Sequence, residues 1–153
     1  IGDARATDMG HAGLVNIGQL AREEYGEAEV FLAGFGSHRG TVIAGDYWGA
    51  PMEEMRLPPA REESWEAHLH ENADGNCLLF SEEIAKTDRL RRPIGHRAVG
   101  VVYDPAREVR GNYVPSVLPE RYDAFLYFEE TEALHPLALF PEAKMPETFP
   151  WQV

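Results

Sequence analysis

The chain has one cysteine, few basic residues and no long apolar run, and each shortage excludes a class of protein. The single cysteine, Cys77, rules out an intramolecular disulfide framework and is typical of a reducing compartment, so we expect a cytoplasmic location. Only 14 lysines and arginines accompany 26 aspartates and glutamates, which gives a formal net charge of −12. Nucleic acid and anionic membrane surfaces would repel this charge, so neither is expected as a partner.

The start of the chain also lacks an initiator methionine and the basic and apolar segments of a secretory signal. No apolar run approaches the roughly 20 residues that a membrane-spanning helix needs. The chain opens IGDARATDMG, in which acidic, basic and hydroxyl side chains stand among small residues. Chain ends seldom carry chemistry, so this concentration of polar side chains at the start of the chain needs an explanation.

The hydrophobic content of 44% suffices for one domain with a buried core. Residues 13–27 predict a helix, because Leu14, Ile17, Ala21 and Tyr25 recur at a spacing of three or four residues. We expect these four side chains to form its buried stripe.

Strand-like segments and further helical segments alternate along the rest of the chain. The apolar run at residues 30–35 predicts a central strand buried on both faces, and residues 41–45 predict a second strand. The other predicted elements are helices at about 62–72 and at 81–90 and strands at 76–80, 96–104 and 121–130. This alternation predicts an α/β fold with three α/β/α layers and a mostly parallel sheet. The recurring prolines of residues 138–153 predict an extended tail.

The glycine-rich segment GFGSHRGT lies between the two predicted strands. A dinucleotide fingerprint would need its last glycine one place earlier and a helix after it. A nucleophile elbow would need glycines two residues to either side of Ser37, where Phe35 and Arg39 stand. We therefore predict a glycine-rich turn that borders a pocket.

Two histidines, His68 and His70, resemble a metal-binding pair. Residues two apart on a helix point about 200° from each other, so the two rings do not share one ion. Glu66 and His70, four residues apart, do share a helix face and form the better candidate pair. A surface ion pair is the alternative to a role in a site.

Four arginines, Arg89, Arg91, Arg92 and Arg97, concentrate positive charge in an acidic chain. They are able to clamp an anionic group, but a solvated face is the simpler interpretation.

The opening residues Asp3, Arg5 and Thr7 alternate with small residues. In an extended conformation they would project on one side, beside backbone that a ligand can approach. A polar rim of a site and a solvated surface both remain open on this pattern.

Six blocks follow in order from Ile1 to about Leu137: IGDARATDMG, NIGQLAREEYG, VFLAGFGSHRGTVIAGDYWG, SWEAHLH, RAVGVVYDP and RYDAFLYFEETEALHPL. In this order they resemble the carboxy-terminal half of the erythromycin esterase-like family. The resemblance implies that residues 1–137 are part of a larger domain, whose missing half or a complementary chain covers apolar surface; a homo-oligomer is the other way to cover it. It also implies that an Asn-x-His stretch with an active-site histidine lies just upstream of Ile1, and that the general base lies further upstream.

The same resemblance implies hydrolysis of an ester or of a macrolide lactone by water that a histidine activates, without a metal, a cofactor or a covalent serine intermediate. Asp3 and Arg5 are then candidates for catalysis, because they follow a presumed catalytic residue. The candidate substrate-binding residues are Thr7, Gly36, His38, Thr41, Glu66 and His70. This chain alone is expected to be inactive.

Two other functions stay open. A scaffold of this family that has lost its reactive groups would be a non-catalytic binding or regulatory module. A metal hydrolase that uses His68, His70 and nearby carboxylates is a weaker third possibility.

Overall fold

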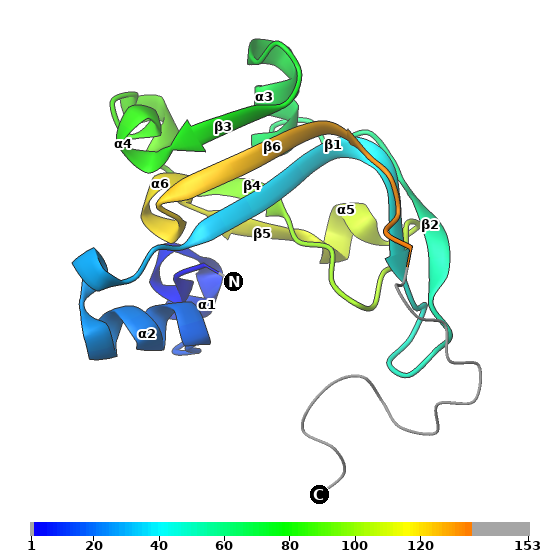
Figure 1. The fold of residues 1–153 in the computed structure, drawn as a ribbon, viewed down its shortest axis with the longest axis horizontal. Helices are drawn as coiled ribbons and strands as arrows, with labels where there is room; N and C mark the ends of the chain where they lie inside the picture. Colours follow the sequence, from blue (N-terminus) through cyan, green and yellow to red (C-terminus); the bar gives the residue numbers. More distant parts are fainter. Residues whose placement is uncertain (1, 136–153) are drawn as a thin grey trace, which may run out of the picture.

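The computed structural model describes residues 2–135, and Figure 1 shows the arrangement of their helices and strands. The helices are α1 (Asp8–His11), α2 (Ile17–Tyr25), α3 (Trp65–Asn72), α4 (Ser81–Ile84), α5 (Glu108–Gly111) and α6 (Leu118–Arg121). The strands are β1 (Ala33–Ala44), β2 (Glu53–Leu57), β3 (Cys77–Phe80), β4 (Ile94–Arg97), β5 (Tyr113–Ser116) and β6 (Ala124–Thr131). Short 3-10 turns cover Ala4–Ala6, Glu27–Glu29 and Asp88–Leu90. The prediction of an extended tail at residues 138–153 lies outside the described residues.

The predicted α/β class is confirmed, and the central sheet is mixed. Its four strands follow the order β2-β1-β6-β3. The inner pair, β1 and β6, is parallel, whereas β2 and β3 pair antiparallel at the two edges. Strands β4 and β5 form a separate antiparallel pair. The direction of neighbouring strands cannot be predicted from a local apolar run, because such a run occurs in parallel and in antiparallel sheets.

One face of the central sheet carries the main core, and we call it the packed face. Phe125 and Tyr127 of β6 point into this core and pack with Trp65 of α3 and with Leu118 of α6. The indole N–H of Trp65 donates to the buried carbonyl of Ser116 at 3.0 Å, so its one polar atom is satisfied. Helices and the β4–β5 pair therefore cover this face.

The other face, which we call the open face, is apolar and uncovered by the described residues. Phe35 of β1, Leu126 of β6 and Leu78 of β3 lie opposite one another across three strands. Phe35 is 61% exposed, and its ring stacks with that of Phe128 at 6.5 Å between centroids. The described residues thus supply two of the three predicted layers over this part of the sheet.

Strand β1 continues through the segment for which a turn was predicted. Residues 33–40 pair with β6, and the strand continues to Ala44, so the expected turn at GFGSHRGT is wrong. The glycines serve close packing instead. A Cβ on Gly36 would lie 2.5 Å from the ring of Phe125, and one on Gly40 would lie 2.0 Å from the carbonyl oxygen of Thr131. Long-range pairing with β6 therefore outweighs the turn propensity of the glycines.

Helix α2 forms as predicted, but it packs with a different side. The Asn16 side chain accepts the amide of Gln19 at 3.0 Å and begins the helix. The expected buried residues Leu14, Ile17 and Tyr25 are exposed, whereas Gly18, Gln19 and Arg22 are buried. Ion pairs of Arg22 hold this polar side against the domain, which leaves the apolar stripe outside.

Two further predicted elements are shorter than expected. The helix predicted at 81–90 ends at Ile84, and the Ser81 hydroxyl bonds to the carbonyl of Tyr122 and does not cap the helix. The strand predicted at 96–104 is replaced by β4 at residues 94–97. Among the described helices, none has both the length and the apolar character that crossing a membrane requires.

Candidate functional site

The opening residues form a pair of capped turns. Residues Ala4–Ala6 adopt a 3-10 turn, which Asp3 begins by accepting the amide of Arg5 at 3.0 Å. The hydroxyl of Thr7 donates to the carbonyl of Ala4 at 2.8 Å, and its oxygen accepts an amide of α1 at 3.2 Å. The expectation of an extended segment with three parallel side chains is therefore wrong, because Asp3 and Thr7 each cap a turn. Thr7 is buried and bonded to backbone.

Asp3 lies between two arginines. The guanidinium Nη2 of Arg5 is 2.5 Å from its carboxylate, and the Nη1 of Arg22 is 3.4 Å away. The other nitrogen of Arg22, Nη2, donates to Asp123 at 2.8 Å. We call Asp3, Arg5, Arg22 and Asp123 the amino-terminal cluster. Two charges of each sign meet here, so the cluster is balanced internally.

Burial and hydrogen bonding act in opposite directions on Asp3. Burial alone would raise the pKa of this carboxyl group, but the hydrogen bonds and positive charge of Arg5, with the hydrogen bond from Arg22, lower its pKa below the ordinary value. The side chain of Asp3 is 3% exposed and that of Arg5 is 44% exposed. A fixed, ionised anchor thus holds an arginine that solvent and a ligand can reach.

The amino-terminal cluster borders a hollow of about 380 Å³. Its wall consists of Asp3, Arg5, Ala6, Arg22, Glu27, Pro119, Glu120 and Asp123. The volume suits a small ligand.

A second polar group gathers at the other end of β6. The rings of His38 and His70 stack at 3.8 Å between centroids, and Nδ1 of His70 lies 2.9 Å from the carboxylate of Glu129. We call these three residues the histidine cluster. Burial lowers the pKa of His38, and the neighbouring His70 lowers it further. Burial would raise the pKa of Glu129, but hydrogen bonds from His70 and Tyr127 lower it on balance.

The predicted pair of Glu66 and His70 does not form. Glu66 is completely buried and instead accepts from Nδ1 of His96 at 2.6 Å and from the amide of Arg97 at 3.0 Å. His70 turns toward Glu129 because α3 lies across the sheet there. Glu66 and His70 do lie four residues apart on α3, but each bonds to a residue of a strand: Glu66 to His96 of β4 and His70 to Glu129 of β6.

Arg97 also departs from the predicted solvated face. Its guanidinium donates to the carbonyls of Ser37 and His38 at 3.0 and 2.8 Å, and it forms a buried ion pair with Glu108 at 2.8 Å. Arg97 therefore ties β4 to β1 and does not offer its charge to a ligand.

The remaining predicted residues lie apart from the amino-terminal cluster. Gly36 packs on Phe125, and the hydroxyl of Thr41 accepts the amide of Ala133 at 2.8 Å. Asp123 and Glu129 are six residues apart near the two ends of β6, a separation of about 20 Å along an extended strand. The two clusters therefore cannot contact the same scissile bond.

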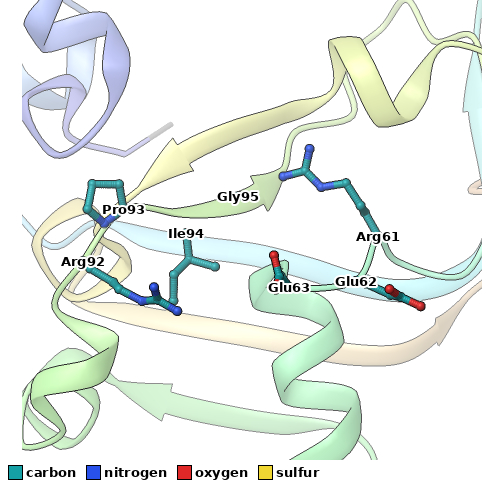
Figure 2. Close-up of a pocket in the computed structure, with 7 residues that line it drawn as sticks. All are labelled: Arg61, Glu62, Glu63, Arg92, Pro93, Ile94 and Gly95. Carbon is teal, nitrogen blue, oxygen red and sulfur yellow. The ribbon is translucent and has the colours of Figure 1, made fainter.

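Figure 2 shows another hollow, of about 600 Å³, between the loop before α3 and strand β4. Arg61 and Glu63 point toward β4, and Arg92 lies beside Ile94. Arg61 also stacks on the ring of Tyr113 at 4.3 Å. None of the residues predicted for catalysis or binding lines this hollow.

Sequence reasoning missed three participants: Arg22, Asp123 and Glu129. Arg22 lies about 100° round α2 from the apolar stripe, so the stripe gave no reason to expect it to be buried. Asp123 and Glu129 occur in a strand-like segment with nothing local to mark them. Only the parallel pairing of β1 with β6 identifies Glu129, because Ser37 pairs with Phe128 and Arg39 with Glu130, which places His38 level with it.

Comparison with known proteins gives a family and related folds. The family model described as erythromycin esterase matches residues 1–131. A Bacillus cereus protein of known crystal structure has a TM-score of 0.65 and 10% identity, over 84% of this chain and 32% of that one. The crystal structure of a succinoglycan biosynthesis protein has a TM-score of 0.61 and 15% identity, over 82% of this chain and 30% of that one.

A mutant of the erythromycin esterase EreC in its open conformation is similar at a lower level, with a TM-score of 0.44 and 18% identity over 74% of this chain and 26% of that one. This chain therefore spans about a third or less of the length of these solved structures.

Proposed function

The chain belongs to the erythromycin esterase family, and on this premise we propose that it is part of an ester hydrolase whose site borders the amino-terminal cluster. Water that a histidine outside this chain activates attacks the carbonyl carbon of an ester or macrolide lactone. Arg5 stabilises the negative charge that develops on the carbonyl oxygen, and Asp3 holds Arg5 in position.

One observation carries this proposal. The exposed guanidinium of Arg5 lines the hollow, and the buried Asp3 anchors it through Nε and Nη2. A bidentate ion pair fixes the plane of the guanidinium. Nη2 of Arg5 also lies 3.5 Å from the carboxylate of Glu27, so the two N–H groups of Nη1 are the ones left for an anion. Arg22 is buried and bonded to both carboxylates, so it positions Asp3 and leaves the oxyanion to Arg5.

The test is the substitution Arg5→Ala in a longer form of the protein, one that contains this chain and hydrolyses an ester. The turnover number should fall by about 100-fold or more, the usual cost of one oxyanion donor. The loss of stability in urea should be smaller than this loss of turnover, because Arg22 still pairs with Asp3. The control is Arg39→Ala, which removes an arginine of similar exposure that pairs with Glu130. Unchanged turnover in Arg5→Ala would remove Arg5 from the site.

The alternative is a non-catalytic binding module on the same scaffold. It is favoured by the internal charge balance of the amino-terminal cluster, because paired charges also occur in purely structural networks. A longer form that contains this chain would then bind an ester without converting it, and Arg5→Ala would weaken binding alone.

The partner in either case is the remainder of a larger domain, which covers the open face. Two observations support this proposal. The chain spans about a third of the length of the solved structures it resembles, and Phe35 and Leu78 are exposed on the open face. A second copy of this chain is the competing occupant. The cytoplasmic location remains a prediction.

A further inference from the structure

The histidine cluster brings together three side chains of the kind that bind transition metals. One nitrogen each of His38 and His70 and one carboxylate oxygen of Glu129 lie within 4.8 Å of one another. Two histidines and one carboxylate form the protein ligand set of several zinc and iron sites, in which water completes the coordination. We propose that His38, His70 and Glu129 bind a divalent transition-metal ion such as Zn²⁺.

His38 supplies an independent reason. Its side chain is 7% exposed, and its Nδ1 has no hydrogen-bond partner among the described residues. A buried polar atom without a partner is costly, and such an atom in a native structure calls for an explanation. Coordination through Nδ1 of His38 would give this atom a partner.

Glu129 and His70 have nearly the spacing suited to one ion. Their ligand atoms are 2.9 Å apart, whereas two ligands that each lie about 2.1 Å from an ion are about 3.4 Å apart at the tetrahedral angle, so a shift of about 0.5 Å makes room for the ion. The ion would replace the contact between Nδ1 of His70 and the carboxylate of Glu129.

One movement is required. A metal ion lies near the plane of each imidazole ring, and the stacked planes of His38 and His70 differ by only 11°. His70 is the exposed member of the pair and lies in the last turn of α3, so its ring is free to rotate out of the stack. His38 and Glu129 stay in place on paired strands of the sheet.

This site differs from the predicted metal pair and from the proposed ester site. It joins His70 to two strands and leaves out His68, which lies about 200° round the helix. It is also about 20 Å along β6 from Asp123, so its ion does not touch an ester in the hollow of the amino-terminal cluster. The proposal therefore does not depend on catalysis.

The experiment is titration of the metal-free 153-residue chain with Zn²⁺ by calorimetry and with Co²⁺ by visible absorption. We expect one ion per chain and Co²⁺ bands typical of four-coordinate geometry. His70→Ala and Glu129→Gln should each weaken binding by at least about tenfold. The matched controls, His68→Ala on the same helix and Glu130→Gln on the same strand, should bind as the parent chain does.

Circular dichroism of each variant reports whether it folds, and the exposure of His70 makes its replacement safe for the core. Absence of saturable binding would overturn the proposal. So would binding that His70→Ala leaves unchanged, or binding that His68→Ala weakens as much as His70→Ala does.

Discussion

Both faces of the central sheet carry apolar side chains, but the two faces differ in their surroundings. On the packed face, Phe125 is 1% exposed among helices and the β4–β5 pair. On the open face, Phe35 and Leu78 keep half or more of their surface exposed. Strand β6 serves both, since Phe125 and Tyr127 point to one side and Leu126 and Phe128 to the other.

This difference shows what the described residues achieve alone. A core of aromatic side chains and a buried polar network complete one side of the sheet, so that side has the features of an independent folding unit. The other side has the residues of a core without the elements that would cover it. An apolar sheet face of this kind is typical of an interface.

The largest expected effect is on the packed face. Phe125→Ala should lower the free energy of unfolding by about 3–5 kcal/mol, because it leaves a cavity between the sheet and α3. Phe35→Ala should change it by less than about 0.5 kcal/mol, because that ring is exposed in this chain. Urea unfolding of both variants makes the measurement, and equal losses would show that the open face is covered in solution.

An intermediate effect is expected on self-association. The double variant Phe35→Ser with Leu78→Ser should lower any association constant of the chain by at least about tenfold, since each buried apolar side chain contributes about 1.5–3 kcal/mol. Light scattering after size-exclusion chromatography measures this. Val109→Ser is the control, because it removes an exposed apolar side chain away from the sheet. A double variant that associates like the parent would exclude the open face as the contact.

The smallest expected effect is on the pH dependence of the free energy of unfolding. It distinguishes the contribution of ion pairs on the packed side from that of apolar side chains. Asp3 belongs to this side, because its amide donates to the carbonyl of Arg121 in α6 at 2.9 Å. Its pKa is lowered on folding, so its ion pairs stabilise the protein above the unfolded pKa. That stabilisation is lost as the pH falls through the folded pKa, below the ordinary value of 3.8.

Asp3→Asn should therefore flatten the acid limb of stability against pH, measured by urea unfolding at a series of pH values below 5. Phe35→Ala should keep the limb of the parent chain. Asp8→Asn, at an exposed carboxylate of α1, is the matched control. If Asp3→Asn and Asp8→Asn gave the same profile, the amino-terminal cluster would not contribute to acid stability.

Local signals predicted several elements well. Helix α2 lies within the predicted residues 13–27, and the apolar residues of 77–80 and 124–131 form strands as expected. These predictions succeeded because helix and strand formers act on their immediate neighbours. The candidate catalytic residues Asp3 and Arg5 do form a pair, and this too is a contact between residues two apart.

The sequence by itself thus determined the α/β class, the approximate positions of α2, α3, β3 and β6, and the polar character of the opening segment. Only the tertiary structure decided that β1 continues through its glycines, that Glu66 binds His96, and that His38, His70 and Glu129 meet. It also decided which side of α2 is buried, since Asp3 and Asp123 hold Arg22 from outside the helix. Local propensities are free energies of about 1 kcal/mol or less per residue. Pairing and packing with distant segments exceed them wherever the two disagree.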